Sequence, residues 1–280
     1  MAVIGVDVGY GYTKAIAENG ESIIFPSVVG SGFERRIEKM FQVGQSDSDN
    51  YDLIIEDPDG EERHYFVGNL AILQSPDAAR PFSDDRSKAE EIKPALLTAV
   101  ARLSRGEKVT LVTGLPLEPF RLQAPALKRS LEKMSGLHVV LNGEKLTIEF
   151  EQVIMFPQAL AAMYGVLKRN NLGSAGVIGL IDMGFRTTDI IMFDLAEKKF
   201  LENYKETIPH GMNDIVVGVQ GVIKNETGYT ANLEAIEQAL IKQRPLFFNR
   251  REYDVWDIAS KLEKSLKSLI VSNIKRRWRD

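Results

Sequence analysis

Apolar residues along the chain follow two patterns: short continuous or alternating runs, and longer runs spaced three and four residues apart. The short runs predict strands, and most of them are bounded by glycine, proline, asparagine or aspartate. The longer runs predict amphipathic helices. Because the two patterns alternate along most of the chain, they indicate an α/β fold in which helices cross over between strands.

The predicted strands occur in both halves of the chain. Residues 1–29 predict a three-stranded meander, because the turn Asn19-Gly20 separates two apolar runs and Pro26 ends the third. A hairpin is predicted from Tyr51 to Val67 around the turn sequence of residues 57–60. The other predicted strands are 108–112, 137–141, 145–149, 151–155, 177–181, 190–193 and one or two within 198–208.

The predicted helices have less even boundaries than the strands. The helix over 120–134 is interrupted or begun at Pro125, and the helix over 157–169 has a proline in its first turn. Gly228 is a C-cap candidate. The remaining helices are 68–74, 87–104, 212–228, 231–242 and a long amphipathic one over 254–278; residues 46–50, 170–176 and 244–249 are read as loops or links.

One motif occurs twice, once in each half. The sequence DVGYGYT covers residues 7–13, and DMGFRTT covers residues 182–188. Each copy follows an apolar strand-like run and precedes another, so the repeated unit is strand, aspartate, glycine turn, strand. The plain alternative is a pair of hairpins with Asp-x-Gly turns and no ligand, and the matching register of the two copies weighs against it.

The chemistry of this unit points to a polyphosphate bound with a metal. Glycines let the backbone approach a ligand closely, and successive N–H groups in such a turn form an anion-binding nest. An aspartate beside the nest would repel a phosphate unless a cation lies between them. Mg²⁺ fits, because it takes carboxylate, water and phosphate oxygens. We therefore expect two loops that hold a nucleotide phosphate chain from both sides.

Composition excludes several classes of protein. The 280 residues suit two domains, and a net charge of −4 with a pI near 5.6 gives no footprint for direct nucleic-acid binding. The chain has no cysteine, no signal-peptide pattern and no apolar run long enough to span a membrane, so we expect a cytoplasmic protein. The basic residues 275–279 suit a helix C-terminus, and the three histidines lack ligand spacing.

The two motifs resemble the phosphate loops of the actin, sugar-kinase and heat-shock-chaperone ATPase superfamily. Residues 156–162 (FPQALAA) are similar to its first connecting helix, and residues 112–116 (VTGLP) are similar to a segment of the plasmid-segregation (ParM-type) and archaeal actin-like branch. The resemblance implies an actin-like (ribonuclease H-like) fold: two α/β domains with mixed sheets flanking a nucleotide cleft. These would be residues 1–156, with a small inserted subdomain at about 30–80, and residues 157–280, with a subdomain at about 212–250.

The resemblance also implies roles for particular residues. Asp7 and Asp182 would lie on the metal side of the nucleotide and bind Mg²⁺, mostly through water for Asp7, and Gln158 would orient the attacking water, which predicts slow hydrolysis of ATP or GTP. Lys14 has the alternative of a solvated strand lysine, and Arg186 of a residue pointing to solvent. The implied nucleotide-binding residues are Gly9, Tyr10, Gly11, Tyr12, Lys14, Gly184, Phe185, Arg186, Thr187 and Gly211.

One departure from the family pattern concerns the base of the nucleotide. The family has a glycine-rich adenosine loop after the long helix, and nothing after Asp189 resembles it. We therefore expect this segment to be missing from the chain, which puts tight nucleotide binding in question.

Three functions remain open from the sequence. The first is a nucleotidase that assembles into head-to-tail filaments and moves plasmid DNA through a DNA-binding adaptor protein. The second is a small-metabolite kinase of the same fold, although no clear carboxylate base for a substrate hydroxyl is found. The third is a binding module that has kept the fold and lost turnover.

Overall fold

The structure is a computed structural model, and it describes residues 1–35, 50–57, 59–80, 90, 92–169 and 175–278. The chain divides into two compact units, Met1–Tyr164 and Gly165–Asp280, which we call the N-terminal and C-terminal units. Among the described helices, none is both long enough and apolar enough to cross a membrane. Parts of several predictions lie outside the described residues: residues 36–49 of the inserted subdomain, which include most of the loop at 46–50, Pro58 of the turn at 57–60, the start of the helix at 87, most of the loop at 170–176 and Arg279 of the basic residues 275–279.

The first sheet of the N-terminal unit has five strands in the order β10-β7-β1-β2-β3. The meander predicted at the N-terminus is confirmed, with β1 and β3 each antiparallel to β2. Strands β7 and β10 add to β1 in parallel, so the carboxyl ends of β1, β7 and β10 meet at one edge. The strands are β1 (Ala2–Val8), β2 (Tyr12–Ala17), β3 (Ser22–Pro26), β7 (Val109–Leu115) and β10 (Phe150–Pro157).

The second sheet of this unit has the order β4-β6-β5-β8-β9. The predicted hairpin β5–β6 is confirmed, but β8 pairs antiparallel with β5 across about half the unit's sequence, for example Leu53 with Leu141. Helix α2 (Asn69–Gln74) packs on this sheet. The strands are β4 (Val29–Ser31), β5 (Asn50–Glu56), β6 (Glu62–Gly68), β8 (Leu137–Leu141) and β9 (Glu144–Ile148).

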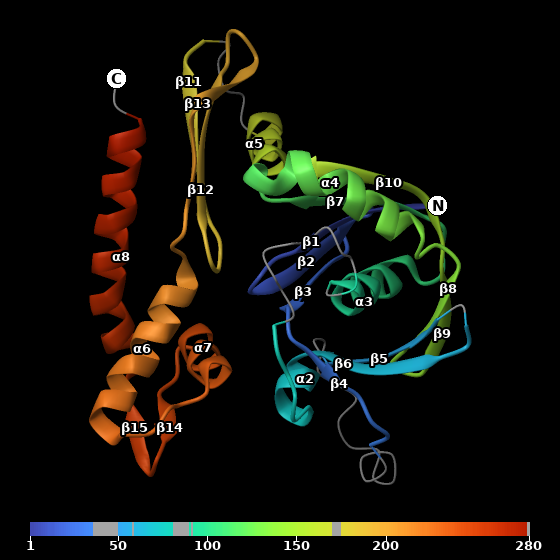
Figure 1. Cartoon of the computed structure of the whole chain (residues 1–280), viewed down its shortest axis with the longest axis horizontal. Coiled ribbons are helices and arrows are strands. Elements are labelled where there is room, and N and C mark those ends of the chain that lie inside the picture. The colour runs from blue at the N-terminus through green and yellow to red at the C-terminus, as the bar shows by residue number, and fades with distance from the viewer. Residues whose placement is uncertain (36–49, 58, 81–89, 91, 170–174, 279–280) are drawn as a thin grey trace. The chain divides into compact units, whose positions relative to one another are not determined.

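Helix α3 (Lys93–Ser104) packs against strands of both sheets (Figure 1). Its side chains are buried on nearly every face. Its described residues begin at Lys93, with Pro94 in the first turn. Helix α4 (Leu117–Glu132) covers β7 and β10. It continues through Pro125, so the predicted interruption is wrong. The buried apolar face of Ala124, Leu127 and Leu131 offsets the one backbone hydrogen bond that the proline removes.

The described part of the C-terminal unit contains the antiparallel sheet β11-β12-β13, packed with helices α6, α7 and α8. The long helix α8 packs on β13 and on α6, and the Trp278 indole donates to the Tyr204 carbonyl oxygen at 2.8 Å. Asp254 caps α8 by accepting from two first-turn amides. The elements are β11 (Val177–Met183), β12 (Thr188–Asp194), β13 (Lys199–Ile208), α6 (Met212–Thr227), α7 (Leu233–Ile241) and α8 (Val255–Arg277).

Two local predictions in the second half of the chain need correction. The segment 244–249 is not a plain link: β14 (Leu246–Phe248) pairs with β15 (Arg251–Tyr253) in a hairpin. Its turn residues Asn249 and Arg250 both have positive φ, a conformation that the composition Asn-Arg signals weakly. Helix α5 (Gln158–Arg169) begins one residue later than predicted, because Pro157 still pairs in β10.

Candidate functional site

The first loop (Asp7–Thr13) is a tight turn between β1 and β2. The Gly9 N–H donates to the Tyr12 carbonyl oxygen at 3.1 Å and closes the turn. Asp7 is paired with Lys14 across the two strands, so the two side chains lie on the same face of the sheet. Lys14 is exposed and Asp7 is half-buried. The loop therefore places a carboxylate, a cation and several backbone amides at one sheet edge.

The second loop (Asp182–Thr188) has the same construction between β11 and β12. The Gly184 N–H donates to the Thr187 carbonyl oxygen at 2.8 Å, which is the equivalent bond. Asp182 is paired with Asp189 across the strands. The repeat seen in the sequence is thus a repeat of backbone structure, and both copies present a strand-end aspartate beside a closed turn.

The first residues of helix α6 hold the second loop through backbone hydrogen bonds. The Met212 and Asn213 N–H groups donate to the carbonyl oxygens of Gly184 and Phe185 at 3.2 and 2.7 Å. Gly211 makes this contact possible, since a Cβ there would lie 2.7 Å from each of these two oxygens. Because every described peptide bond is trans, the Phe185 and Arg186 N–H groups point to the opposite side of the loop.

The first loop is held by a side chain instead. The Arg80 Nη1 donates to the carbonyl oxygens of Tyr10 and Gly11 at 3.2 and 3.1 Å, and the Ser27 N–H also donates to Gly11 at 2.9 Å. Sequence reasoning missed Arg80. It lies almost seventy residues from the loop, and no motif marks it.

Gln158, the first residue of α5, lies against Asp7. Its side-chain Nε2 donates to Asp7 Oδ1 at 2.7 Å. Gly114 on β7 allows the close approach of this segment, since a Cβ on Gly114 would lie 2.0 Å from the Phe156 carbonyl oxygen and 3.4 Å from the Gln158 Cγ. The end of β10 and the end of β1 are thereby brought to one place, as the parallel sheet requires.

The threonine that closes each motif is fully buried. Thr13 shares a hydrogen bond of 2.9 Å with the Ser27 hydroxyl, and the Thr188 hydroxyl donates to the His210 carbonyl oxygen at 2.8 Å. Neither residue was among the predicted site residues, although the matching threonine in both motifs was a usable signal. Their buried hydroxyls anchor the loops to Ser27 and to the His210 carbonyl oxygen.

The predicted site residues therefore form two groups, each within one unit. The N-terminal unit assembles the first loop with Lys14 and Gln158, and the C-terminal unit assembles the second loop with Gly211. Among the described residues, no three histidine, aspartate or glutamate side chains cluster as metal ligands. Each loop presents one aspartate near its strand end, Asp7 or Asp182, and such single carboxylates fit Mg²⁺, which is commonly held by one or two carboxylates together with phosphate oxygens and waters.

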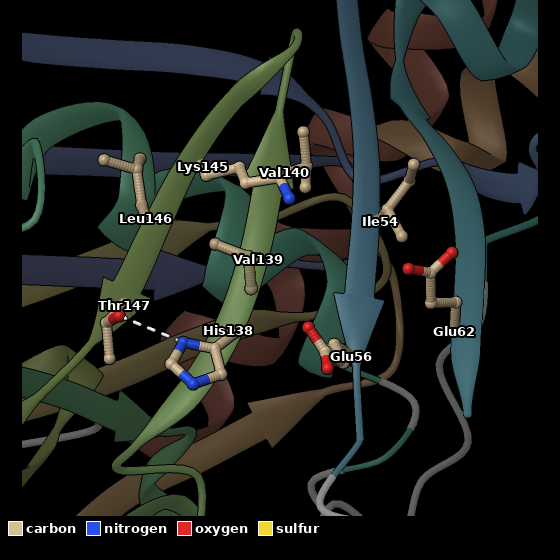
Figure 2. A pocket seen from close by; sticks show the side chains of 9 residues that line it. All are labelled: Ile54, Glu56, Glu62, His138, Val139, Val140, Lys145, Leu146 and Thr147. Atoms are coloured by element: carbon tan, nitrogen blue, oxygen red, sulfur yellow. Dashed lines mark hydrogen bonds between the residues drawn. The ribbon is translucent and has the colours of Figure 1, made fainter. Parts of the chain in front are cut away.

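A cavity elsewhere in the N-terminal unit carries none of these residues. It has a volume of about 190 Å³ and lies on the second sheet, where Glu56 is paired with both Glu62 and His138 across neighbouring strands (Figure 2). The His138 ring shares a hydrogen bond of 3.0 Å with the Thr147 hydroxyl. The polar and apolar side chains that line this cavity do not include the loop amides or the strand-end aspartate that distinguish the two loops.

Comparison with known proteins agrees with the fold. The family described as actin like proteins N terminal domain matches residues 5–160, and the family described as archaeal actin homologue MreB-like, C-terminal, matches residues 180–280. An archaeal actin homolog of Thermoplasma volcanium is 27% identical over 283 aligned positions, covering 98% of this chain and 82% of that protein.

Solved structures give the same picture. A subunit of a 15-stranded ParM filament from Clostridium botulinum is 28% identical, with a TM-score of 0.85 over 99% of this chain and 84% of that chain. The archaeal actin homolog Ta0583 is 26% identical, with a TM-score of 0.79 over 100% of this chain and 83% of that one. The actin-like fold inferred from the sequence is confirmed, and the chain belongs to the actin-like protein family.

Proposed function

We propose that this protein binds ATP with Mg²⁺ in the cytoplasm, hydrolyses it slowly and assembles head to tail into filaments that move plasmid DNA through an adaptor protein. The observation that carries the proposal is the hydrogen bond from Gln158 to Asp7. It joins the residue expected to orient water to the carboxylate expected on the metal side of the nucleotide. GTP is the alternative nucleotide.

The bond fixes the orientation of the Gln158 amide. Because Nε2 donates to a carboxylate, which only accepts, the Oε1 atom is left as the acceptor for a water proton. An amide orients water but is a poor base, so the hydrolysis we propose is slow and depends on positioning. Mg²⁺, when bound with the nucleotide, would neutralise charge on the phosphate oxygens, and Asp7 and Asp182 are the residues that would hold it.

The loop amides would supply the phosphate contacts. In each loop, two successive carbonyl oxygens accept hydrogen bonds from the rest of the unit: those of residues 10 and 11 in the first loop and of residues 184 and 185 in the second. The N–H groups of the same peptide units point the opposite way, which is the arrangement of an anion nest. Lys14, exposed on the same face as Asp7, would add a cation for the phosphate chain. The related protein Ta0583 has been solved in complex with ADP, which supports a nucleotide as the ligand.

Self-association is supported by the relatives. The Clostridium botulinum ParM was solved as a filament, and head-to-tail contacts between identical subunits generate open helical polymers. The net charge of −4 argues for an adaptor protein between such a filament and DNA, since direct binding to a phosphate backbone needs a basic surface.

Three measurements on the purified chain test the proposal. Calorimetric titration with ATP and GTP, with and without Mg²⁺, measures binding; phosphate release measures turnover; light scattering and sedimentation measure polymer. We expect Mg²⁺-dependent binding, slow phosphate release, and polymer that forms only with nucleotide. No binding of either nucleotide would contradict the proposal. Transfer of phosphate to a panel of small hydroxyl compounds would favour the kinase alternative.

A further inference from the structure

The guanidinium of Arg80 contacts the backbone of the first loop. A single nitrogen, Nη1, donates to two successive carbonyl oxygens, those of Tyr10 and Gly11, at 3.2 and 3.1 Å. Hydrogen bonds from a charged donor are stronger and more directional than those between neutral groups. Arg80 therefore fixes the orientation of two neighbouring peptide units rather than one atom.

The orientation of these peptide units determines which way their amides point. The described peptide bonds are trans, so the N–H of each unit is directed away from its own carbonyl oxygen. With the Tyr10 and Gly11 oxygens turned toward Arg80, the N–H groups of Gly11 and Tyr12 face the opposite side. The positive guanidinium also offsets the negative ends of the two carbonyl dipoles, which would otherwise reduce the attraction of the loop for an anion.

In the second loop, backbone N–H groups alone fix the orientation of the corresponding carbonyl oxygens. Its Gly184 and Phe185 oxygens accept from the first N–H groups of helix α6, whose N-terminus carries a partial positive charge. The two loops thus have equivalent turns but different anchors: the start of helix α6 holds the second loop, and the Arg80 side chain holds the first. A point substitution of Arg80 can therefore remove the anchor of the first loop without disturbing a helix.

Arg80 is itself held by the edge of the second sheet. The neighbouring Ala79 exchanges two backbone hydrogen bonds with Val29, the first residue of strand β4, at 2.9 and 3.0 Å. Asp77 accepts from both the N–H and the hydroxyl of Ser31, at 2.9 and 2.6 Å. The segment 77–80 is therefore fixed to β4, and Arg80 extends from this fixed segment to the loop.

We propose that Arg80 is a positioning residue for the first loop: it holds the Tyr10 and Gly11 carbonyl oxygens and so directs the Gly11 and Tyr12 N–H groups toward the nucleotide phosphates. The identity of the ligand, a nucleotide, rests on the proposed function, and the geometry of the loop rests on the contacts of Arg80 described above. Arg80 acts through the loop backbone and is not assigned a contact with the nucleotide.

The test compares Arg80→Met and Arg80→Lys with the control Arg102→Met. Arg102 lies in the same unit and forms an exposed ion pair with Glu21, at 3.2 Å, away from the loop. Loss of a charge-assisted hydrogen bond predicts ATP–Mg²⁺ binding weaker by about tenfold to a hundredfold in Arg80→Met. Arg80→Lys should recover part of the affinity because it keeps the charge, and the control should bind as the wild type does.

Two further readouts separate positioning from a general loss of stability. Added ethylguanidinium should restore part of the binding to Arg80→Ala, which it would not do for a variant that is merely unstable. Without nucleotide, amide hydrogen exchange in residues 7–13 should be faster in Arg80→Met than in the wild type, because the Gly9–Tyr12 hydrogen bond loses its support. Exchange over residues 182–188 should not change.

The outcomes distinguish this inference from the proposed function. Suppose that the wild type binds nucleotide. If Arg80→Met then binds nucleotide equally well, or if its amide exchange in residues 7–13 is unaltered, the inference about Arg80 is wrong and the proposed function stands. If the wild type binds no nucleotide while Arg80→Met still exchanges faster in residues 7–13, the proposed function is wrong and Arg80 positions the loop for another purpose.

Discussion

The Gln158 side-chain amide donates a hydrogen bond of 2.7 Å to the Asp7 carboxylate, although the two residues lie 151 positions apart. Asp7 is the next-to-last residue of β1 and lies at the sheet edge where β10 ends and α5 begins. The bond therefore depends on two parallel strand pairings, β1 with β7 and β7 with β10. It fixes the Gln158 rotamer and also its amide orientation, which is what a residue that orients water requires.

Replacing Gln158 by alanine tests its role in turnover. We expect nucleotide binding to change little and the rate of phosphate release to fall by about tenfold to a hundredfold, because water is no longer positioned. The measurement is single-turnover hydrolysis beside calorimetric binding. The matched control is Gln152→Ala, which replaces an exposed glutamine of β10, the strand that leads into α5. This variant should keep the wild-type rate. Equal rates in the two variants would remove Gln158 from the mechanism.

Gly114→Ala tests the packing that brings Gln158 to Asp7. The new Cβ would lie 2.0 Å from the Phe156 carbonyl oxygen, so β10 must move. We expect the free energy of unfolding to fall by about 1–3 kcal/mol, which is typical of overpacking, and the melting temperature to fall with it. We also expect hydrolysis to fall further than in Gln158→Ala. Circular dichroism melting and phosphate release check both. An unchanged melting temperature would show that β10 is not held as tightly as the structure indicates.

Gly211→Ala tests the anchor of the second loop. Its Cβ would lie 2.7 Å from the carbonyl oxygens of both Gly184 and Phe185, which would push the loop away from the start of α6. We expect weaker nucleotide binding with a folded unit, measured by titration and by circular dichroism. Gly221→Ala is the control within the same helix. Nothing lies within 4 Å of its Cβ position, so it should stabilise the helix by about 0.5–1 kcal/mol.

The lowered pKa of Asp77 leads us to expect that the stability of the fold depends on pH. The hydroxyl and the N–H of Ser31 donate to its carboxylate and hold the pKa of Asp77 below its ordinary value. Since the folded pKa lies below the unfolded one, near 3.9, the stabilisation is present above the unfolded value and is lost as pH falls through the folded one. The melting temperature of wild type should therefore exceed that of Asp77→Asn at pH 7, and the difference should shrink in acid.

The control for this measurement is Asp59→Asn, an exposed aspartate in the turn between β5 and β6. Its difference from wild type should stay small throughout the titration. A gap between wild type and Asp77→Asn that widens on acidification would have the wrong sign and would contradict the role given to the Ser31 contacts.

Much of the local structure could be predicted because it depends on neighbours in sequence. The strand, aspartate and glycine pattern of residues 7–13 and 182–188 specifies a closed turn, and both turns form with the same hydrogen bond. Pro125 misled the prediction, because helix propensity is a local quantity and the buried face of α4 outweighs it. The β14–β15 hairpin was missed because its Asn249-Arg250 turn lacks the usual glycine.

The amino-acid sequence by itself determined the two loops, the order of the elements and the family to which the chain belongs, since these rest on short-range patterns. Only the tertiary structure decided that β8 joins β5, that Gln158 meets Asp7 and that Arg80 holds the first loop. Each of these contacts joins residues far apart in the chain. Their formation depends on strand pairing and packing, which no local pattern of residues encodes.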